Sequence, residues 1–285
     1  MKSTLLKQML RSVLGDEITG WIHAVRMARL AKAAFGTLGE EKEPDMALIP
    51  VFVKKGEVVV DIGANGADWT LGLSRQVGDK GSVFAFEADP YYAQVTRKTI
   101  AVLRLKNVEF FPFGLSDRSE VTMLQVRNAL GERVSGMGTI VRNIESQKVD
   151  EKKFEAVRLQ PLDSIARSYP ALYNVRLIKC DVEGFELMVF RGAMDVLKKA
   201  RPIVITEVGG AHLHGYSDAE LFDFFKGLNY TSYVVVVAGR LRRCERAGDI
   251  PEGIRPNRVM IPNEAVVDPK IIFDAEVTDD ADGVA

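Results

Sequence analysis

"EVVVDIGANGADW", residues 57–69, joins three consecutive valines to an acid, Asp61, and then to a loop that contains Gly63, Asn65 and Gly66. Three β-branched residues in a row are typical of a strand buried on both faces. Glycines directly after such a strand indicate a loop where a ligand comes close to the backbone. The stretch therefore predicts a nucleotide-like ligand bound at the tip of a buried strand, beside a carboxylate.

The rest of the chain alternates apolar runs with helical patterns, which predicts an α/β fold. We expect a Rossmann-like, doubly wound, mostly parallel seven-stranded sheet whose last strand, around "RVMIP" (258–262), is antiparallel. In such a fold the ligand lies outside the carboxyl ends of the strands. The further expected strands are 82–90, 107–117, 175–184, 201–208 and 230–238, and the expected helices between them are 91–107, 185–200 and 218–229.

Residues 118–162 interrupt the alternation with short strand-like runs, which predicts a β insertion in a main domain that spans 46–264. Residues 1–45 carry apolar residues at helical spacing and predict an N-terminal helical extension, packed on the domain or on a second copy in a homo-oligomer. A basic amphipathic membrane-surface helix or a substrate lid are the alternatives for this extension. Residues 265–285 are acidic, and we expect a solvated C-terminal tail.

The composition excludes several classes of protein. A formal net charge of −1 gives no long-range field for phosphate backbones, which argues against general nucleic-acid binding. The two cysteines, Cys180 and Cys244, form no CxxC motif and accompany only three histidines, which argues against a disulfide framework or a structural zinc site. No apolar run approaches the roughly 20 residues of a transmembrane helix. With no signal-peptide pattern, we expect a cytoplasmic protein.

The loop after the first strand is a poor match to a dinucleotide site. It lacks the G-x-G-x-x-G pattern, and Asp61 and Asp68 would stand near a pyrophosphate and repel it. S-adenosylmethionine carries no phosphate, and its sulfonium and amino groups are positive, so a carboxylate favours this cofactor. Glu87 ends the second strand, where an acid can accept hydrogen bonds from ribose hydroxyls. Because NAD-binding folds use the same device, Glu87 indicates an adenosine ribose without separating the two cofactors.

With these pieces placed, the sequence resembles class I S-adenosylmethionine-dependent methyltransferases, and more narrowly the FkbM family, over about residues 45–240. The segments that carry the resemblance are "VVVDIGANGADWTLGLS", "GSVFAFEADP", "NVEFFPFGLSD", "LQPLDSI" and the long block "IKCDVEGFELMVFRGAMDVLKKARPIVITEV". Many relatives carry a smaller or hydroxylated aromatic residue where this chain has Trp69. The cofactor-binding residues that the resemblance implies are Asp61, Gly63, Asn65, Gly66, Trp69, Glu87, Ala88, Leu115, Ser116, Asp117 and Asp181, with "GLSD" (114–117) near the adenine.

Family members are similar in transferring a methyl group to a hydroxyl oxygen, often of a sugar or a polyketide natural product. An alcohol is a weak nucleophile, so the site must remove its proton. Candidates at the ends of the fourth and fifth strands are Asp181, Glu183, Glu207 and His212, with Glu186 and His214 nearby. Alternatively, Asp181 and Glu207 could hold Mg²⁺, which would lower the pKa of the hydroxyl.

The sequence therefore predicts an O-methyltransferase for a hydroxyl of a small molecule, natural product or sugar. An RNA or protein methyltransferase is the first alternative, although no "NPPY"-like motif and no basic groove supports it. An NAD-dependent oxidoreductase and a catalytically silent binding domain are the others. The identity of the acceptor is not encoded in any motif.

Overall fold

The computed structural model describes residues 44–128, 130–131, 133, 138–141, 151–237, 240–244, 246, 257–267 and 272–274. The helices expected over residues 1–45 lie almost wholly outside these residues, as do residues 275–285 of the expected tail. Among the helices in the described part, none has the length and hydropathy needed to cross a membrane. The cytoplasmic location and the homo-oligomer stay predictions.

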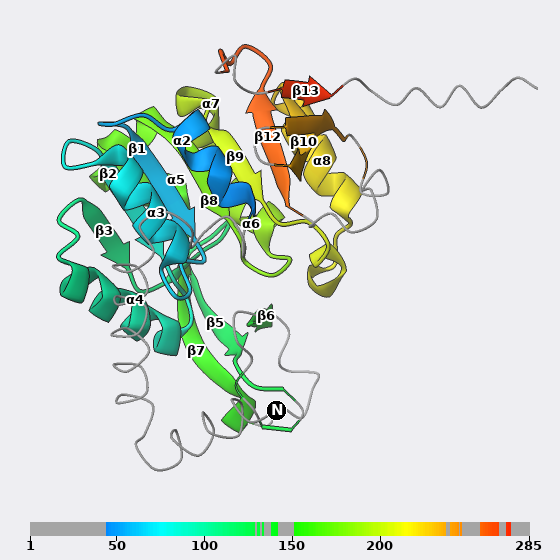
Figure 1. Ribbon diagram of the computed structural model, residues 1–285. Coiled ribbons are helices and arrows are strands. Elements are labelled where there is room, and N and C mark those ends of the chain that lie inside the picture. Colours follow the sequence, from blue (N-terminus) through cyan, green and yellow to red (C-terminus); the bar gives the residue numbers. More distant parts are fainter. Residues whose placement is uncertain are drawn as a thin grey trace, which may run out of the picture.

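One large sheet organises the molecule (Figure 1). Its central strands are parallel, in the order β9-β8-β1-β2-β3, and β12 pairs antiparallel with both β9 and β10. The chain runs from β1 to β2 and β3 on one side and returns to β8 on the other, so the β1–β8 boundary is the point where the strand order reverses. In sheet order the strands are β13 (Ile272–Asp274), β11 (Arg240–Arg243), β10 (Tyr230–Val237), β12 (Arg258–Pro262), β9 (Ile203–Thr206), β8 (Val175–Cys180), β1 (Val58–Ile62), β2 (Ser82–Phe86) and β3 (Val108–Phe111).

The doubly wound, mostly parallel architecture is thus confirmed, with an antiparallel strand at "RVMIP". The count of seven strands is wrong, because β11 and β13 extend the sheet beyond β10 to nine. Ile272–Asp274 pairs with β11, so the sheet reaches into the range expected to be a solvated tail.

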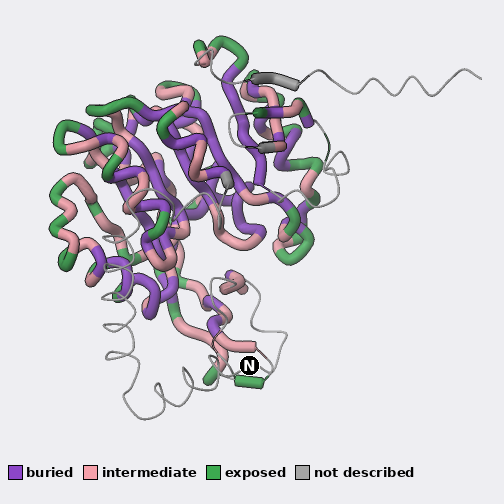
Figure 2. The backbone as a smooth tube through the Cα atoms, viewed as in Figure 1, coloured by how far each residue is buried: buried purple, intermediate pink, exposed green. Residues whose placement is uncertain are grey.

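Helices cover both faces of the sheet, and alternate residues of each strand face opposite layers. On β1, Val59 packs in the same cluster as α3 (Asp68–Val77) and α2 (Ile49–Phe52), whereas Val60 and Ile62 pack in the cluster of the opposite face. That opposite cluster contains residues of α5 (Leu162–Ser168), α6 (Glu186–Arg191), α7 (Met194–Ala200) and α8 (Asp218–Gly227). Figure 2 shows the central strands buried beneath both layers. The remaining long helix is α4 (Pro90–Leu103), which follows β2.

A second, smaller sheet lies beside the carboxyl ends of the main strands (Figure 1). It has the order β4-β7-β5-β6 and contains the strands expected of the β insertion. The strand expected over 107–117 is in fact two strands, because Gly114–Leu115 leaves the main sheet to pair with β7. The strands are β4 (Gly114–Leu115), β5 (Glu120–Gln125), β6 (Thr139–Val141) and β7 (Phe154–Gln160). The exact domain boundaries stay predictions.

The helix expected over 185–200 is two helices, α6 and α7, separated at Gly192. An ideal Cβ on Gly192 would lie 1.9 Å from the carbonyl oxygen of Ser116. The glycine therefore lets the chain between α6 and α7 pack directly on the backbone that follows β4. This contact connects the helical layer to the loop between the two sheets.

Gly192→Ala should lower the free energy of unfolding by about 1–3 kcal/mol, because the methyl group must displace backbone rather than a flexible side chain. Urea denaturation monitored by circular dichroism measures this change. Gly227→Ala is the matched control: it lies at the end of α8 with no atom within 4 Å of the added Cβ, so it should leave stability unchanged or slightly higher. Equal stability of the two variants would contradict the packing role of Gly192.

Candidate active site

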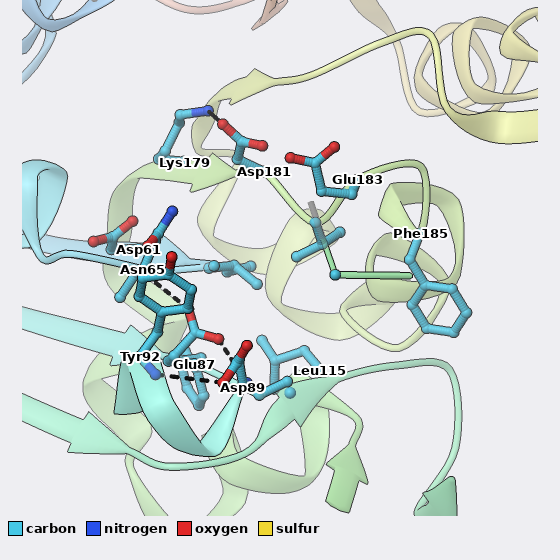
Figure 3. A pocket seen from close by; sticks show the side chains of 18 of the residues that line it. Asp61, Asn65, Glu87, Asp89, Tyr92, Leu115, Lys179, Asp181, Glu183 and Phe185 are labelled. Atoms are coloured by element: carbon cyan, nitrogen blue, oxygen red, sulfur yellow. Dashed lines mark hydrogen bonds and ion pairs between the residues drawn. The ribbon is translucent and has the colours of Figure 1, made fainter. Parts of the chain in front are cut away.

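A cavity of about 470 Å³ opens at the carboxyl ends of β1, β2 and β8, where the strand order reverses. The second sheet supplies the facing wall through Leu124, Ile140 and Leu159, which are apolar. Acidic side chains gather on the main-sheet side. Figure 3 shows Glu87 with Asp89 at one end, Asp181 with Glu183 at the other, and Asp61 apart from both pairs.

Gly63 lets the loop after β1 pass against the end of β8. Its φ of +81° is in the left-handed region, and a Cβ would lie 2.0 Å from the carbonyl oxygen of Asp181. The amides of Gly63 and Ala64 both donate to the carbonyl oxygen of Phe86, at 2.9 Å, which fixes the loop to β2 as well. No other residue type fits this close approach without moving the backbone. The expected glycine loop therefore connects β1 to the ends of both β2 and β8.

Asp61 lies on the α3 face of the sheet, because it is two residues from Val59. Its carboxylate accepts a hydrogen bond of 2.5 Å from the Thr70 hydroxyl on α3, and the residue is 1% exposed. Its register partner on β8 is Lys179, a buried lysine on the same face. Asp61 thus lines the cavity as expected, but one of its oxygens is held by α3.

Lys179 is a site residue that the sequence analysis missed. Its side chain is 1% exposed, its ammonium lies 3.0 Å from the Asp181 carboxylate, and it stands over the ring of Trp69 at 5.4 Å. A charged residue within the otherwise apolar "VRLIKC", two positions before an acid, was the available signal. Since alternate strand residues share a face, Lys179 and Asp181 point the same way.

Glu87 is buried, and Figure 3 shows it beside Asn65 of the loop. One carboxylate oxygen accepts from the amide of Asn65 and the other from the amide of Asp89, each at 2.7 Å. Burial raises the pKa of Glu87 to about 7, against these two hydrogen bonds, which favour the charged form. Asp89 in turn caps α4 by accepting from the amides of Tyr91 and Tyr92.

Asp181, Glu183 and Glu207 bring carboxylate oxygens within 4.8 Å of one another at the ends of β8 and β9. Burial, followed by the charge of Asp181, raises the pKa of Glu183 to about 7 and that of Glu207 to about 8. Glu183 adopts a φ of +56°, a left-handed conformation that costs a non-glycine residue about 1 kcal/mol. Such strain is retained where surrounding contacts enforce it.

Those contacts come from Glu186 and Tyr216. The Glu186 carboxylate accepts from the amides of Val182 and Gly184, and the Tyr216 hydroxyl donates to the Gly184 carbonyl at 2.7 Å. A Cβ on Gly184 would meet the carbonyl oxygen of Gly210 at 2.3 Å, so the loops after β8 and β9 touch through their backbones. Glu186 therefore shapes the loop that presents Glu183.

A family model described as the methyltransferase FkbM domain matches residues 61–232, which is more than half of the chain. The chain belongs to the FkbM methyltransferase family. The sequence resemblance and the prediction of a methyltransferase are confirmed. No curated protein matches the sequence.

Several solved structures are similar at low identity. The FkbM methyltransferase of Methylobacillus flagellatus is 14% identical, with a TM-score of 0.45 over 72% of this chain and 43% of that one. This FkbM chain thus spans less than half of that protein. A SAM-dependent methyltransferase from Aquifex aeolicus is 16% identical, with a TM-score of 0.37 over 77% of this chain and 94% of that one. An O-methyltransferase from Bacillus cereus, in complex with SAH, is 14% identical, with a TM-score of 0.41 over 91% and 98%.

Not every expected site residue lines the cavity of this FkbM domain. Asp61, Gly63, Asn65, Gly66, Trp69, Glu87, Ala88, Leu115, Asp181 and Glu183 do. Ser116 and Asp117 are not among the lining residues; the Ser116 side chain is fully buried and its hydroxyl donates to Asp117. His212 is exposed in the short 3-10 helix Ala211–His214. Glu207 belongs to the carboxylate cluster but is not among the lining residues.

The raised carboxyl pKa values make the stability of the free protein pH-dependent. Glu87, Glu183, Glu186 and Glu207 hold protons in the folded state up to pH about 7–8, whereas their ordinary value is 4.5. The folded state therefore binds more protons over this window, and the free energy of unfolding should fall as pH rises from 5 to 9.

Urea unfolding of the wild type and Glu207→Gln at a series of pH values tests this dependence. The variant should show a shallower fall between pH 7 and 9, because its side chain cannot ionise. Asp223→Asn, an exposed acid on α8, should keep the wild-type slope. Parallel slopes for the wild type and Glu207→Gln would contradict the assignment.

Proposed function

We propose that this FkbM protein is an S-adenosylmethionine-dependent O-methyltransferase that acts on a hydroxyl of a small molecule, a natural product or a sugar. The observation that carries the proposal is the distribution of charge in the cavity. Glu87 lies at one end and Asp181 with Glu183 at the other, and apolar side chains of the second sheet, Leu124, Ile140 and Leu159, form the facing wall. A cavity with acids at both ends suits a phosphate-free, cationic cofactor.

The residues present fit an adenosyl ligand. Each oxygen of Glu87 accepts one backbone hydrogen bond and retains a further lone pair, so the carboxylate could receive both ribose hydroxyls. Leu115, Leu124, Ile140 and Leu159 provide apolar surface for an adenine ring. The loop at Gly63, Asn65 and Gly66, next to Asp61, would hold the methionine part. The bound cofactor supplies a methyl group activated by its sulfonium.

The chain's own task is to orient the acceptor and remove its proton. Glu183 lines the cavity beside Asp181, and their carboxylates lie close enough to receive a hydroxyl together. A carboxyl pKa near 7 leaves a fraction of Glu183 ionised at neutral pH while making the carboxylate a stronger base than an exposed one. Lys179 favours the ionised form of Asp181. We therefore assign proton removal to Glu183, with Asp181 orienting the hydroxyl.

A mechanism that uses a divalent ion fits this site less well than proton removal by a carboxylate. Mg²⁺ bound by Asp181 and Glu207 would have to share the Asp181 carboxylate with the Lys179 ammonium, 3.0 Å away. Two cations on one carboxylate repel each other, so this arrangement favours the general-base route. His212 is exposed and outside the cavity lining, which favours the carboxylates over the histidine.

S-adenosylhomocysteine should bind the wild-type protein in isothermal calorimetry, whereas NAD⁺ should give no heat. Glu87→Gln should weaken S-adenosylhomocysteine binding about tenfold or more, because one of the two oxygens that accept backbone amides and would accept ribose hydroxyls becomes an NH2 group. Asp79→Asn, an exposed acid at the turn before β2, should bind like the wild type. Binding of NAD⁺ in preference to S-adenosylhomocysteine would refute the proposed cofactor.

Glu183→Gln should lower turnover by about 100-fold or more while leaving the affinity for S-adenosylhomocysteine within about twofold, because only proton removal is impaired. Transfer of a labelled methyl group to a panel of hydroxylated acceptors measures turnover, and EDTA should not change it. Asp223→Asn should keep full activity. Full turnover of Glu183→Gln would remove Glu183 from the mechanism, and loss with EDTA that Mg²⁺ restores would favour the metal route.

A further inference from the structure

Arg133 joins three parts of the molecule that are distant in sequence, and the proposed chemistry does not use it. Its side chain is 3% exposed. One terminal nitrogen donates to Asp89 at 2.9 Å, and both terminal nitrogens donate to Glu155 on β7, at 3.1 and 3.0 Å. The guanidinium also stands over the ring of Tyr91 at 4.9 Å. A buried arginine with two acidic partners is typical of an ion pair that links separate secondary-structure elements.

On the main-domain side, one further hydrogen bond connects Asp89 to Glu87, the carboxylate that we propose binds the ribose. Arg133 and the amides of Tyr91 and Tyr92 all donate to the same oxygen of Asp89. The amide of Asp89 donates to Glu87 at 2.7 Å. A shift of Asp89 would therefore move the amide that orients Glu87. Without the guanidinium, the buried Asp89 carboxylate would also lack this compensating charge.

On the other side, Arg133 contacts the second sheet. Glu155 lies on β7, and the Arg133 backbone bridges to Arg127, just after β5. β5 and β7 pair along their length, from Glu120–Leu159 to Gln125–Phe154. These two strands carry Leu124 and Leu159, two of the residues of the apolar wall. Arg133 therefore connects a strand of this wall to Asp89, in the turn that bears Glu87.

We propose that Arg133 is a positioning residue for the adenosyl end of the cofactor, clamping the second sheet to the α4 N-terminus so that its apolar wall and Glu87 engage the same nucleoside. This inference rests on the proposed function, because it takes the cavity ligand to be adenosyl. It adds to that function a residue outside the cavity lining. It also makes the β insertion part of the cofactor site rather than of the acceptor site alone.

The test compares Arg133→Met with Arg118→Met in full-length protein. Arg118 lies in the same insertion and pairs with Glu120 at 3.0 Å, but its side chain is 60% exposed, so its pair contributes little. Calorimetry measures the affinity for S-adenosylhomocysteine and for 5′-methylthioadenosine, which lacks the amino-acid part. Arg133→Met should weaken both ligands by a similar factor, about tenfold or more, whereas Arg118→Met should bind like the wild type.

Two further variants separate positioning from folding. Arg133→Lys keeps the positive charge but loses the planar guanidinium with its two terminal nitrogens. Its affinity for both adenosyl ligands should lie between those of Arg133→Met and the wild type. Glu155→Gln removes the partner on β7, whose side chain is 36% exposed, and should weaken both adenosyl ligands less than Arg133→Met does. If Arg133→Met does not fold, Glu155→Gln and Arg133→Lys carry the test.

The outcomes distinguish the two levels of the argument. If the wild type does not bind S-adenosylhomocysteine, the proposed cofactor fails. If the wild type binds and the Arg133 and Glu155 variants bind equally well, the cofactor stands and the clamp is refuted. A loss confined to S-adenosylhomocysteine, with 5′-methylthioadenosine unaffected, would also refute it, because the effect would then lie at the amino-acid end.

Discussion

The parallel pairing of β1 with β8 is the constraint on which the site depends. It sets Asp61 beside Lys179 and Ile62 beside Cys180, and it carries the chain after each strand into the same small space. Only a glycine can follow Ile62 there, because the Asp181 carbonyl occupies the position of a Cβ on Gly63. The glycine loop is therefore required first by the packing of two strands, and only then by a ligand. The contact between Gly63 and the Asp181 carbonyl thus belongs to the pairing of β1 with β8 and also shapes the ligand site.

Strand alternation then distributes the charges. Residues 60 and 62 face the layer of α6 and α7, so Asp61 must face α3, where Thr70 holds it. The same alternation places Lys179 on the α3 side of β8, with its ammonium over the face of the Trp69 ring. Burying one lysine among several acids reduces the mutual repulsion that would otherwise oppose folding. It also leaves the cavity acidic enough to favour a cation.

Much of this arrangement was predictable from the sequence, and the exceptions have physical reasons. Buried strands with Val and Ile runs are found where expected, because burial on both faces demands such residues. The break at Gly192 was missed because the helical periodicity continues through it, whereas its close approach to Ser116 is a tertiary contact with no signal in the sequence. Strand β4 was missed because two residues carry no periodicity. Glu87 was predictable from its place at a strand end, whereas Arg133 has meaning only through Asp89 and Glu155, which are distant in sequence.

The strained loop after β8 explains why several carboxylates can share one place. Glu183 in the left-handed region would relax if its neighbours allowed it, yet Gly184 is fixed by Tyr216 and Gly210, and the loop amides are fixed by Glu186. The buried Glu186 thus accepts hydrogen bonds from backbone amides and not from a lysine or arginine among the described residues. Lys179, the buried lysine of β8, therefore pairs with Asp181 instead. The acids after β8 therefore divide in role: Glu186 builds the loop, whereas Asp181 and Glu183 line the cavity, although the three lie within six residues of one another.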